Sequence, residues 1–187
     1  MPIVSPQLWA LGALAAFGIL ELTQRKGEAA KSLKTSAADR GSTSLIVFSY
    51  VVVATCLSLK CSDNWISPPW QWVFVVVAWS GVVLRKAVMR TLGAYYTRTL
   101  KFATGQKLIT VGPYKYIRHP GYLSSLMIWG GAAAASGALV GALIAVTALL
   151  VAYLYRIRTE EQMLMAVLGE TYEEYRKRSW RLLPFIF

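Results

Sequence analysis

The stretch GQKLITVGPYKYIRHPGY, residues 105–122, lies between long apolar segments and is the most distinctive part of the chain. It is basic, aromatic and rich in turn residues, which is typical of a functional loop at the end of a rigid element. Gly112-Pro113 predicts a turn. Proline is favoured at the first position of a helix, so we expect His119 at the N-cap and Pro120 at the first helical position. A helix start presents unpaired N–H groups, and with Arg118 beside it this one suits a carboxylate or phosphate.

The composition indicates a membrane protein. The 187 residues are 56% hydrophobic with a mean hydropathy of +0.45, yet the net charge is +11. A soluble domain of this length could not bury so much apolar sequence, so the apolar residues are expected to face lipid. Of the 20 Lys and Arg residues, five lie in 24–43, eight in 85–118 and six in 156–187, and these segments alternate with apolar ones. This distribution favours cytoplasmic membrane loops over nucleic acid binding, which needs a basic face on a soluble surface.

Five apolar runs predict an all-α integral membrane bundle of about five transmembrane helices: 9–22, 44–59, 70–84, 120–135 and 138–155. The second run is rich in β-branched residues, but a lone strand in lipid would leave its backbone groups unpaired. The third is expected to continue as a helix through Arg90. Ser136-Gly137 leaves only a tight turn between the last two runs, whose many Gly and Ala residues predict a closely packed helical hairpin.

These runs divide the chain into two regions. Residues 1–90 are expected to hold three spans with a basic cytoplasmic loop over 24–43. Residues 91–187 are expected to hold a cytoplasmic cofactor loop, the helical hairpin and amphipathic C-terminal helices. Five spans place the N-terminus outside and the C-terminus inside, which puts all three basic segments on the cytoplasmic face.

The tail is expected to contain two short helices. The first covers 159–168 and is stopped by Gly169. The second starts at a capping box formed by Thr171 and Glu174. The following segment, 180–185, has the composition of an interfacial anchor.

Acidic residues are absent between Asn64 and Thr159, and the first ones after that gap are Glu160 and Glu161 at the end of the fifth span. Arg156 precedes Glu160 by four residues and Arg158 precedes Glu161 by three, so each pair is expected to share a helix face. A solvated charge cluster would have the same pattern. Ionisable residues near membrane depth, however, tend to be functional.

The sequence offers little for metal or nucleotide binding. His119 is the only histidine, and Cys56 and Cys61 are the only cysteines. They make neither a disulfide framework nor a zinc site. There is no GxGxxG or Walker motif. We therefore expect no metal.

The stretch 105–122 resembles the core signature of the isoprenylcysteine carboxyl methyltransferase family, integral membrane enzymes related to phospholipid methyltransferases. A second block agrees in spacing, and together the two blocks cover roughly residues 90–187; the second contains Arg156, Glu160, Glu161, Leu164, Gly169, Tyr172, Tyr175, Leu183 and Pro184. Three positions depart from the family pattern. Gln106 occupies a position where a histidine is common, and Gln162 one where a third acid is frequent. Gly121 places no side chain at the position after the proline.

The resemblance implies an S-adenosylmethionine-dependent methyltransferase. It implies a cofactor pocket formed by Gln106, Lys107, Leu108, Ile109, Tyr114, His119, Pro120, Gly121, Tyr122 and Glu160. To these we add Arg118, which suits the carboxylate of the methyl donor, and Glu161 beside Glu160. The resemblance also suggests that Arg156 faces the methyl acceptor, so Arg156 and Glu160 are the candidate catalytic residues.

The acceptor stays open at this point. A carboxylate acceptor needs a fixed cation, which Arg156 can supply. An amine acceptor needs a base, for which Glu160 or Glu161 would serve. The favoured function is carboxyl methylation of an isoprenylcysteine-like acceptor that enters from the bilayer at the cytoplasmic interface. The alternatives are N-methylation of a phospholipid amine, methylation of another small lipophile, and a non-catalytic scaffold that binds anionic lipid through its basic loops.

Overall fold

The structure, a computed structural model, describes residues 5–23, 41–58, 66–93 and 108–184. These ranges form helices α1 (Pro6–Thr23), α3 (Ser42–Ser58), α4 (Pro68–Leu92), α5 (Pro120–Ala135), α6 (Leu139–Leu168) and α7 (Glu170–Arg178), with a short 3₁₀ helix η3 (Gly112–Lys115). The predicted all-α fold is confirmed. Within the described ranges, the only β-type pairing is an isolated parallel bridge between Ile117 and Trp180.

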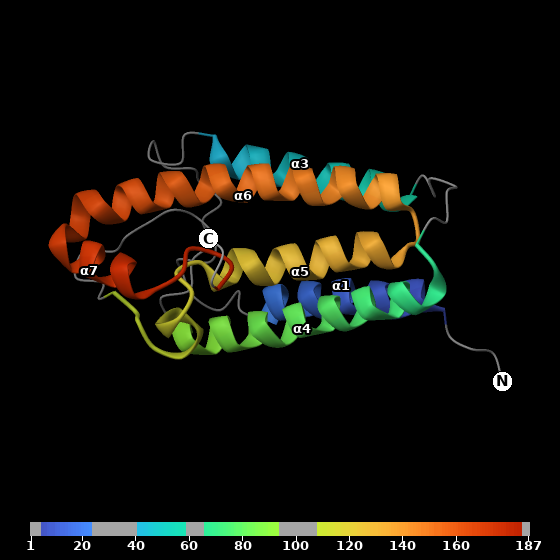
Figure 1. Cartoon of the computed structure of the whole chain (residues 1–187), viewed down its shortest axis with the longest axis horizontal. Coiled ribbons are helices and arrows are strands. Elements are labelled where there is room, and N and C mark those ends of the chain that lie inside the picture. Colours follow the sequence, from blue (N-terminus) through green and yellow to red (C-terminus); the bar gives the residue numbers. More distant parts are fainter. Residues whose placement is uncertain (1–4, 24–40, 59–65, 94–107, 185–187) are drawn as a thin grey trace.

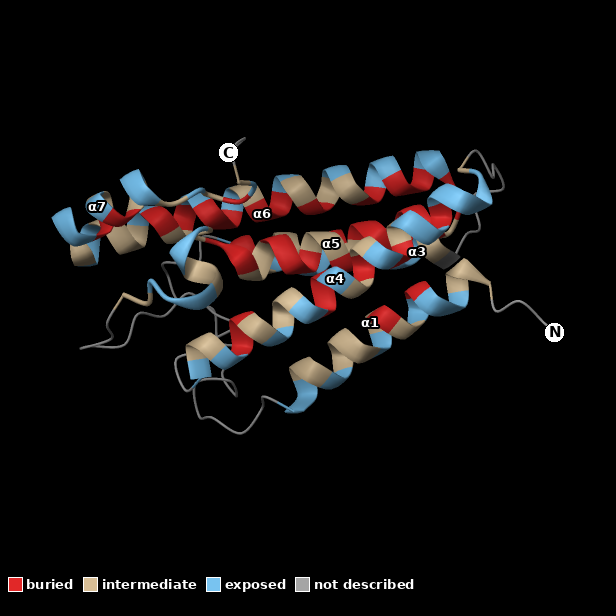
Figure 2. Cartoon of the chain, turned by 60° about the horizontal axis from the view of Figure 1, so that its bottom comes forward, coloured by how far each residue is buried: buried red, intermediate tan, exposed pale blue. Residues whose placement is uncertain are grey.

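The five long helices lie alongside one another in a bundle (Figure 1). Helix α4 packs most extensively on α5, and α3 packs on α6, while α1 covers α4 and α5. Helix α7 and η3 lie at one end of the bundle, together with the start of α5 and the ends of α4 and α6 (Figure 1). Buried residues gather on the inner faces of α4, α5 and α6 (Figure 2).

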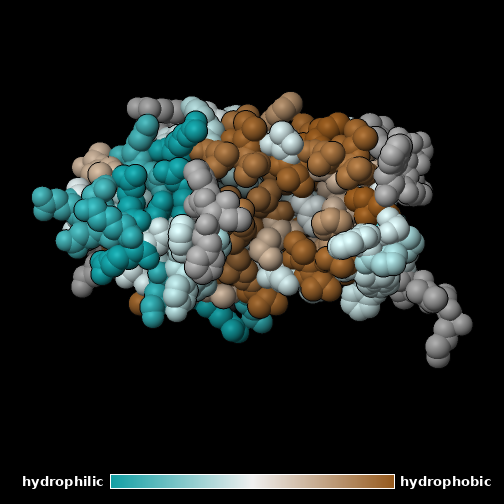
Figure 3. Space-filling view, viewed as in Figure 1, coloured by the Kyte–Doolittle hydropathy of each residue, from teal (hydrophilic) through white to brown (hydrophobic). Residues whose placement is uncertain are grey.

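The outer surface of the bundle suits lipid. Large apolar side chains are exposed along its length, among them Phe48, Val76, Val83, Leu143 and Val151. The space-filling view shows an apolar body and a hydrophilic end that contains α7 (Figure 3). Of the described helices, α1, α4 and α6 are long and apolar enough to cross a membrane. Helices α3 and α5 are shorter, at 17 and 16 residues. All five predicted apolar runs are therefore helical, and three of them have the length of a full span.

Small residues bring α5 close to two neighbours. A Cβ at Gly131 would lie 2.9 Å from the Phe74 carbonyl oxygen in α4, and one at Gly130 would lie 3.1 Å from Val146 in α6. On the α4 side, Gly81 is equally tight, since its Cβ would lie 2.8 Å from Ile128. The predicted hairpin of α5 and α6 is present, and Gly137 in its turn has a φ of +91°. The small residues of α5 nevertheless serve its packing on α4 as much as its packing on α6.

Helix α4 continues to Leu92, as predicted, but two expectations for the tail are wrong. The fifth span and the helix expected over 159–168 are one helix of 30 residues, because no glycine or proline interrupts 156–158. Gly169 ends it with a φ of +51°, as predicted. Helix α7 then begins directly at Glu170, so Thr171 lies inside the helix and makes no capping bond. The capping box fails because the glycine itself occupies the N-cap position.

Several predicted features lie outside the described residues. They include most of the basic loop 24–43, the cysteine at 61, and residues 94–107 of the loop before η3.

Candidate active site

The start of α5 places His119 at the heart of the polar end. His119 is the N-cap residue and Pro120 follows at the first position, as the sequence predicts. The imidazole does not cap the helix. It turns toward α6 instead, where Nε2 lies 3.3 Å from Glu161 Oε1 and Nδ1 lies 3.8 Å from Glu160 Oε2. The basic stretch and the acidic pair, about forty residues apart in the chain, thus meet around one buried ring.

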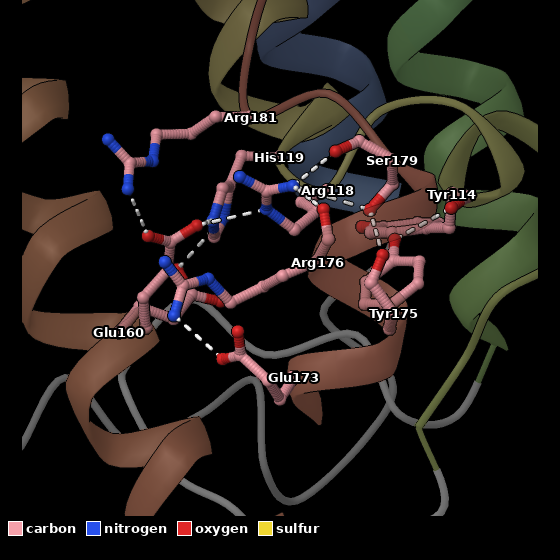
Figure 4. A network of polar contacts seen from close by, with 10 residues as sticks. Tyr114, Arg118, His119, Glu160, Glu173, Tyr175, Arg176, Ser179 and Arg181 are labelled. Carbon is pink, nitrogen blue, oxygen red and sulfur yellow. Dashed lines mark hydrogen bonds and ion pairs between the residues drawn. The ribbon is translucent and has the colours of Figure 1, made fainter. Parts of the chain in front are cut away.

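Glu161 is the centre of the first group of contacts. Its partners Arg118, His119 and Arg181 are labelled in Figure 4. Arg118 Nε donates to its Oε1 at 3.0 Å, and Arg181 Nη2 lies 2.9 Å from its Oε2. A buried carboxylate is costly unless it is paired and hydrogen-bonded, and here two guanidinium groups and an imidazole surround it. The sequence predicted that Glu161 and Arg158 share one helix face, but Arg158 is exposed and Glu161 is buried. That pairing is wrong because Glu161 points into the bundle toward the chain segments that close its end.

Arg118 ties the start of α5 to the end of α7. Its Nη1 donates to the backbone carbonyl of Arg176 at 3.0 Å and also to the backbone carbonyl of Ser179. The last carbonyls of a helix have no partner within it, so a cation at this position satisfies them. The guanidinium therefore holds protein groups together, and its expected contact with the carboxylate of a ligand stays a prediction.

Residues 179–182 form a C-terminal strap that pairs with the segment before α5. Arg118 N donates to the Trp180 carbonyl at 2.7 Å, Trp180 N to the Tyr116 carbonyl at 2.8 Å, and His119 N to the Arg181 carbonyl at 3.2 Å. Leu182 at the end of the strap is buried. The segment was expected to be an interfacial anchor. Its residues 180 and 181 satisfy backbone groups of the loop that carries His119, and its expected place at the membrane interface stays a prediction.

Helix α7 holds the same loop through Tyr175, whose hydroxyl donates to the Tyr114 carbonyl at 2.6 Å. Burial raises the pKa of Tyr175 to about 12. The hydroxyl therefore stays protonated, and remains a donor, throughout the neutral range.

A second group of contacts joins Glu160 to Arg156 through Tyr122. The Tyr122 hydroxyl donates to Glu160 Oε2 at 2.8 Å and accepts from Arg156 Nε at 3.3 Å. Arg156 is only 2% exposed, and its Nη1 also donates to the hydroxyls of Ser42 at 2.7 Å and Thr43 at 3.0 Å. Arg156 and Glu160 thus lie on one face of α6, as predicted. The role of α3 in holding Arg156 was not predicted, because Ser42 and Thr43 carry no distinctive sequence signal.

The remaining predicted pocket residues divide into those that the structure describes and those that it does not. The Tyr122 ring stacks on Tyr153 with centroids 5.5 Å apart and lies 5.8 Å from the His119 ring. Leu108 and Ile109 are half-buried in the segment before η3. Gln106 and Lys107 lie outside the described residues. In the ranges that the structure covers, no group of three or more His, Cys, Asp or Glu residues could hold a metal ion.

Comparison with known proteins agrees with this arrangement. A model of the isoprenylcysteine carboxyl methyltransferase (ICMT) family matches residues 72–166, just over half of the chain, which run from α4 through Glu160 and Glu161. A probable protein-S-isoprenylcysteine O-methyltransferase of Oryza sativa subsp. indica is 36% identical over 121 residues, which cover 62% of this chain and 62% of that protein. Methanethiol S-methyltransferase 2 of Bradyrhizobium diazoefficiens is 29% identical over 157 residues, which cover 74% of this chain and 59% of that protein.

The fold is shared with a solved structure of the eukaryotic intramembrane Ras methyltransferase ICMT. The two superpose with a TM-score of 0.63 at 18% identity, covering 99% of this chain and 70% of the other. The match to the rice and Bradyrhizobium relatives spans less than two thirds of their own length. The family model nevertheless covers the elements that bring His119, Tyr122, Arg156 and Glu160 together. The chain belongs to the isoprenylcysteine carboxyl methyltransferase family.

Proposed function

We propose that this protein transfers a methyl group from S-adenosylmethionine to a lipophilic acceptor, and that the acceptor is an isoprenylcysteine-like carboxylate. One observation carries the proposal: Glu160, Tyr122 and Arg156 form a hydrogen-bonded row at the polar end of an apolar bundle. The relatives support the reaction type, since the rice protein is named as an O-methyltransferase and the Bradyrhizobium protein as an S-methyltransferase. Their names also show that the acceptor varies among similar proteins.

The donor side of the row is Glu160 with the start of α5. When bound, S-adenosylmethionine supplies an electrophilic methyl group on a sulfonium cation. The Glu160 side chain is 27% exposed, so its carboxylate can meet a cationic ligand. The Tyr122 ring beside it suits a cation through its π face. At the start of α5, Pro120 has no N–H, and the N–H groups of Tyr122 and Leu123 donate to the His119 carbonyl. The Gly121 N–H is therefore the one that suits a carboxylate. These groups fit the donor's ammonium, sulfonium and carboxylate.

In this proposal the predicted pocket residues have two roles. Those that would contact the donor are Gln106, Lys107, Leu108, Ile109, Tyr114, His119, Pro120, Gly121, Tyr122 and Glu160. Arg118 and Glu161 are engaged with each other and with the strap, so we assign them to holding the loop and His119 in place.

The acceptor side is Arg156. The hydroxyls of Ser42, Thr43 and Tyr122 orient its guanidinium. A fixed guanidinium can hold a carboxylate in one geometry. A carboxylate is already a nucleophile, so the protein's task is to align acceptor and donor and to exclude water. An amine acceptor would instead lose a proton, and Glu160 is placed to receive it.

We place the site on the cytoplasmic side of the membrane. The exposed cations Arg90, Lys115, Arg158, Lys177 and Arg178 belong to elements at the polar end of the bundle. Basic residues beside membrane helices are retained in the cytoplasm. A reporter fused after residue 187 that is active only in the cytoplasm should be active, and an exclusively exported signal would contradict this orientation.

The experiment that tests the function uses the purified protein with methyl-labelled donor and three acceptors in parallel. They are a prenylcysteine analogue, phosphatidylethanolamine and a small alkyl thiol. Label in the prenylcysteine ester supports the proposal. Label in the lipid amine or in the thiol would replace the acceptor but keep the reaction. No transfer to any acceptor, together with no heat of binding for S-adenosylhomocysteine, would favour the non-catalytic scaffold.

A further inference from the structure

A second ion pair lies within the membrane-spanning helices, away from Glu160 and Glu161. Arg85 in α4 contacts Glu21 near the end of α1, with Nη2 at 2.6 Å and Nε at 2.9 Å from the same carboxylate oxygen. The two side chains are only 12% and 15% exposed. The Arg85 guanidinium also lies 5.4 Å from the centroid of the Phe17 ring. The pair thus joins α1 to α4 in a largely apolar setting.

Another contact of Arg85 reaches the start of α5, which we assign to the donor side of the site. Its Nη1 donates to the backbone carbonyl of Gly121 at 3.1 Å. That carbonyl belongs to the first turn of α5, between Pro120 and Tyr122. A Cβ at residue 121 would lie 3.3 Å from the same Nη1, so a glycine here gives the guanidinium room to approach. Glycine at position 121, a departure from the family pattern, therefore has a physical reason in this chain: it lets Arg85 reach the backbone.

Holding α1 against α4 does not by itself require charges. Burying two charges costs several kcal/mol, and apolar side chains of similar size often hold helices together as well or better. Ionisable residues inside a membrane protein are correspondingly rare and tend to be functional. What an apolar side chain cannot do is hold a backbone carbonyl by a directional bond. Arg85 donates such a bond to the Gly121 carbonyl, while Glu21 accepts from the other two nitrogens of the same guanidinium.

We infer that Arg85 and Glu21 are positioning residues for the entrance of α5, and this inference rests on the proposed function. The hydroxyls of Ser124 and Ser125 also donate to the Gly121 carbonyl, but both belong to α5 itself. Arg85 is the donor that ties this carbonyl to α4, and through it Arg85 sets where Tyr122 and His119 lie relative to Glu160. Glu21 lies outside the part of the chain that the family model matches, whereas Arg85 lies inside it. Helix α1 therefore contributes to the site through a contact that begins at Glu21.

The test compares Arg85→Met and Glu21→Gln with the control Arg90→Met, which removes an exposed cation from the same helix. Binding of S-adenosylhomocysteine is measured by calorimetry, thermal stability by melting, and the order of residues 116–125 by amide hydrogen exchange. Arg85→Met should weaken binding by about tenfold, the size expected for loss of one hydrogen bond from a charged group. It should also speed exchange in 116–125. Arg90→Met should change neither quantity, and Glu21→Gln should fall between the two.

The exchanged pair, Glu21→Arg with Arg85→Glu, separates positioning from simple support. It restores an ion pair between α1 and α4 but removes the guanidinium from the Gly121 carbonyl, which keeps only the hydroxyls of Ser124 and Ser125 as side-chain donors. Its melting temperature should therefore rise above that of the single variants, while binding stays about tenfold weaker than in the wild-type protein. Recovery of both quantities would overturn the inference, since it would show that the pair only supports packing.

Two further outcomes are decisive. If the wild-type protein does not bind S-adenosylhomocysteine, the proposed function fails, and exchange in 116–125 alone decides the present inference. Unchanged exchange in Arg85→Met overturns it. If Arg85→Met does not fold, Arg85→Lys is measured in its place. Lysine keeps a positive charge for Glu21 but lacks the planar guanidinium that contacts Glu21 and the Gly121 carbonyl at once. Wild-type binding and exchange in Arg85→Lys would likewise overturn the inference.

Discussion

The Tyr122 hydroxyl connects the donor side of the site to its acceptor side. Tyr122→Phe removes its hydrogen bonds to Glu160 and Arg156, at 2.8 Å and 3.3 Å, and changes nothing else in the side chain. A hydrogen bond to a charged group contributes about 1.5–3 kcal/mol. Because the Glu160 side chain is 27% exposed, water can replace part of this contact, and we take the lower value. A loss of about 1.5 kcal/mol lowers kcat/KM by about tenfold.

The assay measures kcat/KM for the donor at saturating acceptor, together with the melting temperature. The phenylalanine keeps the ring stack on Tyr153, so the melting temperature should fall by only about 2–4 °C, the shift expected for about 1 kcal/mol in a chain of this length. Tyr116→Phe is the matched control, because Tyr116 is 60% exposed and lies in the same segment. If Tyr122→Phe retains kcat/KM within about twofold of Tyr116→Phe, well short of that tenfold loss, the hydroxyl bridge is not part of the site.

Three other predictions address the remaining contacts. Arg156→Ala should abolish transfer while S-adenosylhomocysteine binding stays within about threefold, or 0.7 kcal/mol, of wild type. Its melting temperature should also fall, because the hydrogen bonds from Arg156 to Ser42 and Thr43 are lost. Glu160→Gln and His119→Ala should each weaken S-adenosylhomocysteine binding in calorimetry by about tenfold, and unchanged affinity in both would contradict the proposed pocket. Tyr175→Phe should lower the free energy of unfolding by about 0.5–1.5 kcal/mol, because it removes the hydrogen bond to the Tyr114 carbonyl. Since burial raises the pKa of Tyr175 to about 12, the wild-type contribution should be constant below pH 10 and decline between about pH 10 and 12 in a pH series of melts.

The sequence determined the helices and the point where α5 begins, because both depend on local chemistry. Apolar runs in lipid must satisfy their own backbone, so each of the five runs is a helix. Proline fixes φ and lacks an N–H, so α5 begins at Pro120 with His119 at its N-cap. The spacing of Arg156 and Glu160 placed them on one face of α6. The capping box at Thr171 failed although it is also a local pattern, because the conformation of Gly169 decides where α7 begins.

The tertiary structure alone decided which charged groups meet. Glu161 pairs with Arg118, 43 residues away, rather than with Arg158 on the preceding turn of the same helix. Arg85 contacts Glu21 across 64 residues and Gly121 across 36. The strap of residues 179–182 pairs with the loop before α5 through backbone hydrogen bonds that no local pattern predicted. Local sequence determines which groups a segment offers. Which of them are buried, and therefore need a partner, follows only when the helices pack against one another.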